Sequence, residues 1–421
     1  MSTPKAQTVL LVLAAGGGHY PQKQVIDHLR ATGRRIVLVR GGAHPVREFD
    51  ADADEVVEAD VFNVNALLTE VARYAATAPV DAVLSVNEYA VVQTALLCAA
   101  LGLKGLSPVA AMRCRNKYLA RLALAESGID QPRFRLVRTP GDLEGLGEVL
   151  GWPYILKPLN HGGSSAVVKI GSAEDAERTA TAMSRLRETA AATEFIEDDL
   201  AAYWIAEEYA PGVEICVECV VDAGGCQVVA VHDKMVLNDD VGFVEPFFVT
   251  PPPRLDAAAQ ETVRQRAVEV LAALGFDHGV AHLEFRVDRG RPLLLEVNGR
   301  IGGLLVAASV EYSTGVSLGA CLARVALGEP VHLQVGRRRP TGFCTVYTGG
   351  PGRIRSLSGT ETVQDMAGLL VWEQWLRVGD VVPEGTNGDI ASAMFTADTP
   401  ENVYRLTRRA ADAVVCELES R

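Results

Sequence analysis

The sequence lacks any apolar run long enough to cross a bilayer, since no stretch approaches the roughly 20 apolar residues that a spanning helix needs. It also lacks a basic segment before its first apolar run, TVLLVLAAGG, which therefore predicts a first strand and not a signal peptide. Basic residues are outnumbered too, because 40 Lys and Arg against 53 Asp and Glu give the 421 residues a formal net charge of -13. An acidic surface repels nucleic acid and anionic lipid, so we expect neither as a partner. The cytoplasm is the expected location.

Close cysteine pairs are few, which argues against a disulfide or metal framework. Of the eight cysteines only Cys216 and Cys219 lie near each other, and the alternation of VEICVECVV predicts a strand with the two thiols on opposite faces. We interpret both as small buried apolar residues. The chain has no Walker motif, HExxH, nucleophile elbow or biotin-anchoring motif. Its GGGHYPQ segment lacks the GxGxxG spacing, so a tight strand-to-helix turn is preferred to a nicotinamide site.

An alternation of strands and helices over the first hundred residues indicates the fold class there. Runs such as TVLLVLAAGGG, RRIVLVRGG and DAVLSVN alternate with helical stretches, which predicts βαβ units and a parallel sheet. Ser107 and Pro108 make a good cap and first turn for the next helix. From about 110 to 330 the pattern indicates an α+β arrangement, and the basic segment 331–340 leads into a third unit of short strands and a final helix. A chain of this length is expected to form two to four domains.

The strongest chemical signal is the segment 281–303, AHLEFRVDRGRPLLLEVNGRIGG. Two β-rich runs flank a short turn with a glycine, which is the signature of a hairpin. A three-residue loop of residues 289–291 places Glu284 opposite Glu296 on one face. A two-residue turn would instead put the two glutamates on opposite faces.

The same register places His282 opposite Asn298, on the face that carries both glutamates. Glu284 and Glu296 would repel each other unless a cation sits between them. Two carboxylates and an amide oxygen are ligands that Mg²⁺ or Mn²⁺ prefers. A solvated charged face fits less well, because both glutamates are embedded in apolar runs. The segment therefore predicts a metal site made of Glu284, Glu296 and Asn298.

Two further segments carry weaker signals for nucleotide binding. Lys157 ends a predicted strand and precedes a glycine-serine loop at 160–165, a combination that suits phosphate oxygens but also occurs in surface turns. In WIAEEYAPGVEICVECVV, Glu207 ends one predicted strand and Glu214 begins the next. Both could accept hydrogen bonds from an exocyclic amine and ribose hydroxyls, or form a solvated strand edge.

In this order the segments resemble the ATP-grasp superfamily: a lysine on a helix, a lysine before a glycine-rich loop, an EE-x-x-x-G-x-E linker, an HxE and an ExN followed by arginine. The match runs from about 110 to 330. The resemblance implies a mixed α/β and α+β fold in three parts. These are a Rossmann-like N-terminal domain at 1–110, an ATP-grasp domain at 111–330 with a lid at about 115–210, and a C-terminal α+β domain at 331–421.

The resemblance also assigns the ATP contacts, and it agrees with the metal ligands derived above. The implied ATP contacts are Lys117 and Lys157 at the phosphates, Ser164 and Ser165 in the phosphate-covering loop, Glu207 and the backbone of Ala210 at adenine, Glu214 at ribose and, on a looser alignment, Lys234 at a phosphate. For Lys234 a plain surface lysine is the alternative.

Within the superfamily, RIGG at 300–303 and STGVSL at 313–318 resemble the L-amino-acid ligases that make dipeptides and related amides. The resemblance implies that Arg300 stabilises the acyl phosphate and the oxyanion formed on amine attack. An arginine that simply pairs with Glu296 is the structural alternative. The implied substrate contacts are Asn87, Glu88, Glu245 and Gly303, although Glu88 could equally be an acidic residue in the first turn of a helix.

The expected reaction has MgATP phosphorylate a carboxylate, an amine attack the acyl phosphate, and phosphate leave, with ADP as the nucleotide product. The expected partners are a small carboxylate and an amine, both amino acids, with a homodimer left open. One alternative is a carboxylase or purine-pathway enzyme that uses bicarbonate or formate. Another is a nucleotide-binding protein without turnover.

Overall fold

The structure is a computed structural model, and it describes most of the chain. The described residues are 6–14, 19–41, 48–160, 166–191, 203–235, 247–334, 336, 339–383 and 388–419, without the side chains of 48 and 184–191. Three residues of the predicted site, Ser164, Ser165 and Glu245, lie outside them, as does most of the first glycine-rich turn.

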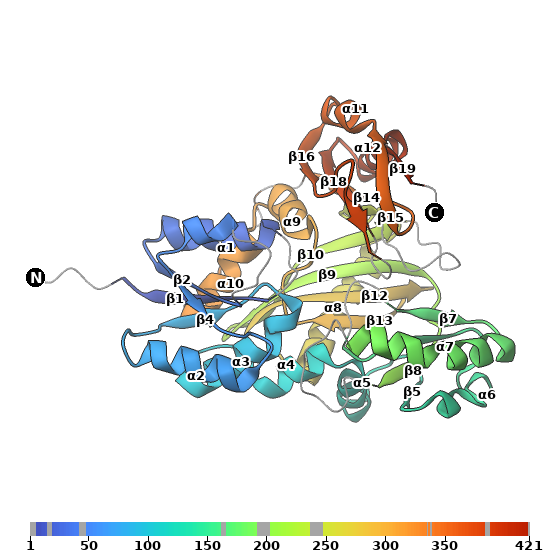
Figure 1. The fold of residues 1–421 in the computed structure, drawn as a ribbon, viewed down its shortest axis with the longest axis horizontal. Coiled ribbons are helices and arrows are strands. Elements are labelled where there is room, and N and C mark those ends of the chain that lie inside the picture. Colours follow the sequence, from blue (N-terminus) through green and yellow to red (C-terminus); the bar gives the residue numbers. More distant parts are fainter. Residues whose placement is uncertain are drawn as a thin grey trace, which may run out of the picture.

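A parallel sheet in the order β3-β2-β1-β4 forms the N-terminal part, as the βαβ pattern predicted (Figure 1). The apolar run of β1 is buried along its whole length, because helices cover both faces of the sheet. The Asn87–Glu88 pair lies shortly after the carboxyl end of β4. The elements are β1 (Thr8–Leu13), α1 (His19–Ala31), β2 (Arg35–Arg40), η1 (Glu48–Asp52), β3 (Glu55–Glu58), α2 (Val64–Ala75), β4 (Ala82–Leu84), η2 (Glu88–Ala90) and α3 (Val91–Leu101).

A four-stranded sheet in the order β5-β8-β6-β7 follows (green, Figure 1). The predicted cap at its approach is confirmed, since the Ser107 side chain accepts a hydrogen bond from the backbone at the start of α4 and Pro108 is the first helical residue. The elements are α4 (Pro108–Arg115), α5 (Lys117–Glu126), β5 (Phe134–Val137), η3 (Pro140–Leu143), α6 (Leu146–Leu150), β6 (Tyr154–Pro158), β7 (Val168–Ile170), α7 (Ala173–Ala191) and β8 (Trp204–Glu208).

An eight-stranded antiparallel sheet in the order β13-β12-β9-β10-β11-β14-β18-β16 forms the centre of the molecule. Strands from the C-terminal part continue this sheet, and that part rises above it in Figure 1. Cys216 and Cys219 belong to different core clusters on the two faces of β9, as predicted. The elements up to the last helix before the C-terminal part are β9 (Val213–Asp222), β10 (Gly225–Met235), β11 (Phe247–Thr250), α8 (Ala257–Leu274), β12 (Gly279–Asp288), β13 (Arg291–Asn298), α9 (Val306–Thr314) and α10 (Leu318–Leu327).

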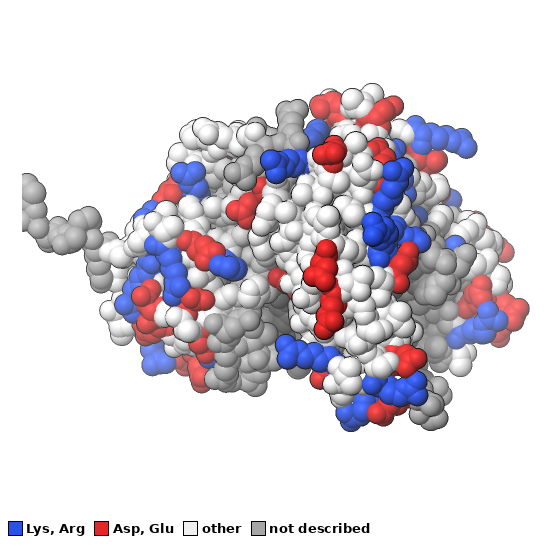
Figure 2. All heavy atoms as spheres, turned by 90° about the horizontal axis from the view of Figure 1, so that it is seen from above, with Lys and Arg blue, Asp and Glu red and all other residues white. Residues whose placement is uncertain are grey.

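The C-terminal part adds a small sheet, β17-β15-β19, beside the strands that extend the central sheet. Its elements are β14 (Thr341–Tyr347), β15 (Gly352–Ser358), α11 (Thr360–Gln364), β16 (Leu369–Gln374), β17 (Val381–Val382), β18 (Asp389–Thr396), α12 (Pro400–Ala413) and β19 (Val415–Leu418). No helix in the described part of the chain is long and apolar enough to span a membrane. Acidic and basic side chains are interspersed over the face shown in Figure 2, so the described residues of this face form no single continuous patch of negative charge.

The β12–β13 hairpin has the predicted register around Glu284 and Glu296, but it does not have the predicted turn. Asp288 pairs with Arg291, so the turn has two residues, both with positive φ, and the three-residue loop was wrong. A β-bulge at Leu295 adds one residue to β13 between the pairs Phe285–Leu294 and Glu284–Glu296. This extra residue restores the register that the shorter turn would have lost. Glu284 therefore lies opposite Glu296, and His282 opposite Asn298, as predicted.

Candidate active site

Two lysines face the two glutamates of the hairpin. Lys117 is the first residue of α5, because the Asn116 side chain accepts hydrogen bonds from the helix's free N–H groups. Its Nζ lies 2.9 Å from Oε1 of Glu296, and Nζ of Lys234 lies 2.9 Å from Oε2 of Glu284. Each carboxylate of the cross-strand pair thus has its own cation, which offsets the repulsion between them.

A buried histidine connects Glu284 to a second carboxylate on β9. Nε2 of His282 lies 3.2 Å from Oε1 of Glu284, and its Nδ1 contacts the fully buried Glu218. Burial lowers the pKa of His282, but Glu218 more than offsets this and raises it well above the usual range. Burial raises the pKa of Glu284, yet Lys234 and His282 hold it far below its ordinary value. Glu284 is therefore held as an anion in a fixed orientation.

The hairpin offers oxygen donors that suit a hard divalent cation. The side chains of Glu284 and Glu296 keep 18% and 21% exposure, while Asn298 on the same face is buried. Within the described ranges no group of three or more His, Cys, Asp or Glu side chains forms a metal cluster. A cation here would thus be held by two carboxylates, one amide oxygen and oxygens of a ligand, a set that fits Mg²⁺ or Mn²⁺. The ligand roles stay a prediction.

Lys157 and Glu207, predicted at the phosphates and at adenine, are each other's partners in this structure. Their Nζ and Oε2 atoms lie 2.7 Å apart, and both residues are buried. Arg121 of α5 completes the group with hydrogen bonds of 2.7 and 3.2 Å from Nε and Nη2 to the Glu207 carboxylate. Burial raises the pKa of Glu207, but Arg121 and Lys157 bring it down to about 2. Burial also keeps the pKa of Lys157 below its usual value, although Glu207 opposes this.

Glu214, predicted at ribose, lies between two cations on neighbouring strands. Its Oε1 is 3.1 Å from Nζ of Lys234, and its Oε2 accepts a hydrogen bond of 2.8 Å from Nε of Arg286. Glu207, Glu214, Lys157 and Lys234 are all buried, so the alternatives of a solvated strand edge, a surface turn and a surface lysine were wrong. Lys234 bridges Glu214 and Glu284 and thereby joins the predicted ribose acceptor to the predicted metal ligand.

Arg300 pairs with Glu88 of the N-terminal part, and not with Glu296 as the structural alternative had it. Its Nε lies 2.7 Å from Oε2 of Glu88, while Nη1 of Arg115 lies 2.9 Å from Oε1. Burial raises the pKa of Glu88, but Arg300 and Arg115 outweigh it and lower the pKa below the ordinary value. Glu88 is also the first residue of η2, the alternative weighed for it. Both of its oxygens already have a cation, so a substrate amino group would compete with two arginines.

The remaining predicted substrate contacts differ in their surroundings. Asn87 is fully buried, and its Oδ1 accepts a hydrogen bond of 3.3 Å from the backbone N of Ala14. Gly303 is exposed, with open space where a side chain would project. The backbone of Ala210, predicted at adenine, follows β8 and is buried.

Three family models match the chain along its length. An ATP-grasp N-terminal domain matches residues 27–105, an ATP-grasp domain matches 150–308, and L-amino acid ligase C-terminal domain 2 matches 345–419. The chain belongs to the ATP-grasp superfamily. Within it, this ATP-grasp protein carries the C-terminal domain of the L-amino acid ligases, so the predicted superfamily, branch and three-part fold are confirmed.

Curated relatives of this ATP-grasp protein are distant in sequence. The L-arginine-specific L-amino acid ligase of Bacillus subtilis is 23% identical over 380 residues, 88% of each chain. The alanine–anticapsin ligase of Bacillus subtilis is 26% identical over 291 residues, 66% of this chain and 58% of the relative. An L-amino acid ligase structure from Bacillus licheniformis superimposes with a TM-score of 0.83 at 21% identity, covering 99% of this chain and 100% of that one. The structural likeness shows a shared fold.

Sequence reasoning did not assign several charged residues that contact the predicted site of this ATP-grasp protein. Glu218, Arg121 and Arg115 are buried and contact His282, Glu207 and Glu88 respectively, residues that the sequence did single out. A signal existed for Glu218, which interrupts the apolar strand VEICVECVV. Arg121 and Arg115 lie on short helices, where a charged side chain is ordinarily expected to face solvent.

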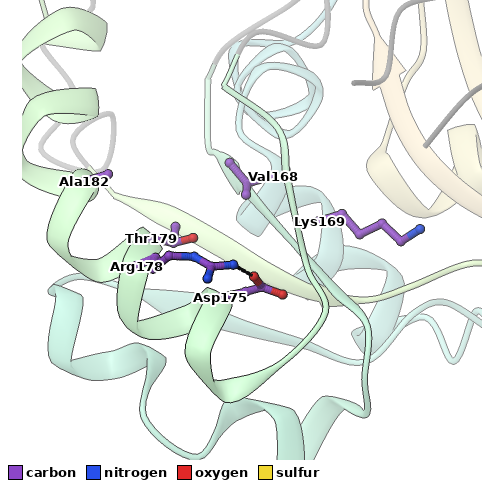
Figure 3. A pocket seen from close by; sticks show the side chains of 6 residues that line it. All are labelled: Val168, Lys169, Asp175, Arg178, Thr179 and Ala182. Carbon is purple, nitrogen blue, oxygen red and sulfur yellow. Dashed lines mark hydrogen bonds and ion pairs between the residues drawn. The ribbon is translucent and has the colours of Figure 1, made fainter. Parts of the chain in front are cut away.

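A surface pocket lies at β7 and α7. It is lined by Val168, Lys169, Asp175, Arg178, Thr179 and Ala182 of β7 and α7 (Figure 3). Figure 3 shows Arg178 directed at Asp175, while Lys169 points away from both. None of the residues predicted for the site lines the pocket.

Proposed function

We propose that this ATP-grasp protein is an ATP-dependent carboxylate–amine ligase that joins amino acids through an acyl phosphate and releases ADP and phosphate. The observation that carries the proposal is the pairing of both hairpin glutamates with lysines, Glu296 with Lys117 and Glu284 with Lys234. Carboxylates with lysines directly beside them suit a ligand that brings both a divalent cation and phosphates, because the cation can bind the carboxylates while the phosphates bind the lysines. The names of the relatives, an amino acid ligase and an alanine ligase, support the substrate class.

The proposed nucleotide site combines lysines from three elements with acceptors on β8 and β9. Lys117, Lys157 and Lys234 bind phosphates, Glu207 and the Ala210 backbone bind adenine, and Glu214 binds ribose, with Ser164 and Ser165 covering the phosphates. Glu284, Glu296 and Asn298 hold Mg²⁺ or Mn²⁺, which supplies charge neutralisation at the phosphates. We retain the sequence-derived division at residues 110 and 330, with the lid at about 115–210.

The proposed chemistry needs no protein nucleophile. A carboxylate oxygen of the first amino acid attacks the γ-phosphorus, and the bond to the β-phosphate oxygen breaks to leave ADP. The amine nitrogen of the second substrate attacks the acyl carbon, loses a proton, and expels inorganic phosphate as the amide forms. Negative charge gathers on the acyl oxygen and on the leaving phosphate, so a fixed cation lowers the barrier. Arg300 takes this role.

The proposed amino-acid contacts are Asn87, Glu88, Gly303 and Glu245. Both carboxylate oxygens of Glu88 are paired with arginines. Glu88 can therefore bind a substrate amino group only by giving up one of these two arginines. Such an exchange would free Arg300 for the acyl phosphate at the moment when the substrate is bound. The ion pair Glu88–Arg300 thus links the binding of the amine to the catalytic cation.

A phosphate-release screen of amino-acid pairs, in both orders and with the product mass recorded, tests the proposal. We expect ADP and phosphate to form only when carboxylate and amine partners are both present, with a product whose mass equals the two substrates less one water. A control with bicarbonate and no amine addresses the carboxylase alternative. ADP formation in that control, or no ADP with any pair, would contradict the proposal.

A further inference from the structure

A buried arginine without an assigned role lies next to the proposed nucleotide site. Arg121 is 2% exposed and follows Lys117 by four residues on α5, so the two side chains lie on the same side of the helix. Its side chain is almost completely removed from solvent, so water does little to offset its charge. Arginines are rarely buried unless they are paired, so this placement calls for a specific partner.

Arg121 uses the same two acceptors as Lys157. Both bind the Glu207 carboxylate, Arg121 through Nε and Nη2 at 2.7 and 3.2 Å and Lys157 through Nζ at 2.7 Å. Both also donate to the backbone carbonyl of Leu295, at 3.3 and 3.2 Å. Leu295 is the bulged residue of β13, where the extra residue interrupts the strand ladder and leaves its carbonyl for other donors. The two cations thus tie α5, β6 and β8 to the strand that carries Glu296.

The shared acceptors have a consequence for any ligand that recruits Lys157. To reach a phosphate, Lys157 must give up its contacts with Glu207 and the Leu295 carbonyl. Glu207 would then lose one of its two cations. A buried carboxylate without a partner is strongly destabilising. Arg121 holds both carboxylate oxygens of Glu207 and has a planar fork that fits them, so Glu207 stays paired after Lys157 leaves.

We infer that Arg121 is a positioning residue of the ATP site, which keeps Glu207 paired and thereby lets Lys157 exchange Glu207 for a nucleotide phosphate. The inference rests on the proposed function for the role of Lys157, and it adds a residue that contacts no substrate. Without Arg121, Glu207 holds Lys157 as its one remaining strong cation. ATP would then have to break that pair and leave an unpaired anion behind.

The test compares binding of the non-hydrolysable β,γ-imido analogue of ATP, with Mg²⁺, to the full-length protein and its variants by calorimetry. Arg121→Met should weaken binding at least tenfold, and Arg121→Lys should restore part of it. Arg133→Met is the matched control, because Arg133 pairs with the neighbouring Glu208 on the same strand but at the surface. It should bind the analogue as the wild type does, and Arg121→Met should leave the KM for the amino acids unchanged where turnover can be measured.

A second substitution separates positioning from a merely structural role. If Glu207 traps Lys157 in Arg121→Met, then Glu207→Gln in the same protein removes the trapping charge but keeps an amide oxygen that can accept a hydrogen bond from adenine. The double variant should therefore recover at least part of the lost affinity. A structural role predicts instead that the double variant binds more weakly than the single one. If Arg121→Met does not fold, Arg121→Lys with and without Glu207→Gln gives the same comparison.

The outcomes also distinguish the inference from the proposed function. Unchanged analogue binding by Arg121→Met, or a double variant weaker than the single one, would overturn the inference alone, because wild-type binding and ligation would persist. Absence of analogue binding by the wild type would overturn the proposed function and the inference together.

Discussion

Arg300 and Glu88 are ion-paired across two parts of the chain, with Nε and Oε2 2.7 Å apart. Arg115 holds the other oxygen of Glu88, so the carboxylate keeps a cation if Arg300 moves or is removed. This arrangement allows the electrostatic role of Arg300 to be separated from its contribution to stability, since the loss of one partner does not leave Glu88 alone.

Arg300→Met tests that separation. Charge on the acyl oxygen develops only during reaction, so turnover should fall by about 100-fold or more while the affinity for the ATP analogue stays nearly unchanged. Arg300→Lys should recover only part, because an ammonium lacks the planar fork of a guanidinium. Single-turnover rates, analogue affinity and melting temperature are measured on the same preparations. Normal turnover by Arg300→Met would remove Arg300 from the chemistry.

Glu296→Ala should abolish ligation at ordinary magnesium concentrations and leave the fold intact, because the side chain is partly exposed and its role is local to the hairpin. Mn²⁺ binding in the presence of the ATP analogue, followed by electron paramagnetic resonance, reports the lost ligand directly. Glu269→Ala, at an exposed position of α8, serves as the control and should bind Mn²⁺ normally. Wild-type Mn²⁺ affinity in Glu296→Ala would exclude that glutamate as a ligand.

Glu207 should make the free energy of unfolding depend on pH in the acid range. Burial raises the pKa of this carboxyl, but Arg121 and Lys157 bring it from an ordinary value of 4.5 to about 2 in the folded protein. Because the folded value is the lower one, ionised Glu207 stabilises the fold above pH 4.5, and this contribution is lost as the pH falls toward 2. The contribution is on the order of 3 kcal/mol.

Urea unfolding of the wild type and Glu207→Gln between neutral and acid pH measures this effect. The free energies of unfolding should differ most near neutral pH and converge as the pH falls. Glu208→Gln is the neighbouring control, where the partly exposed carboxylate should show a much smaller difference. Parallel curves for Glu207→Gln and the wild type across the acid range would contradict the assigned pKa.

Gly302 and Gly303 form a matched pair of sites for testing the contact between Glu218 and His282. A Cβ at Gly302 would lie 2.6 Å from Val306 Cγ1, 2.8 Å from His282 Nδ1 and 2.9 Å from Glu218 Oε1, while one at Gly303 meets nothing within 4 Å. Gly302→Ala should therefore cost about 1 to 3 kcal/mol of folding free energy. Gly303→Ala should leave the melting temperature unchanged. Equal melting temperatures for the two variants would show that the Glu218–His282 contact has room to move.

The chemical face of the hairpin could be predicted from the sequence, but its turn could not. Alternating apolar and acidic residues fix which side chains of Glu284, Glu296 and Asn298 share a face, because the strand period is two. The run RPLLLEVN gives no sign of a bulge at Leu295, since it contains no glycine. Two departures, a shorter turn and an extra residue, cancelled in the register.

The partners of the predicted residues were hidden because they are distant in the chain. Arg121 and Glu207 are 86 residues apart, and Arg300 and Glu88 come from different parts of the fold. Periodicity reports which face a residue occupies and says nothing about which side chain meets it from another element. The position of Lys234 between Glu214 and Glu284 was hidden in the same way, since these three residues come from different strands.

The transfer of oxygen from the carboxylate to phosphate tests the central claim most directly. The first amino acid is labelled with ¹⁸O in its carboxyl group, and the phosphate and amide from one turnover are examined by mass spectrometry with the amine present. An acyl phosphate requires that one carboxylate oxygen leaves with the phosphate, so we predict one ¹⁸O in each phosphate and one in each amide carbonyl. Phosphate without ¹⁸O, or label appearing in AMP, would contradict the account.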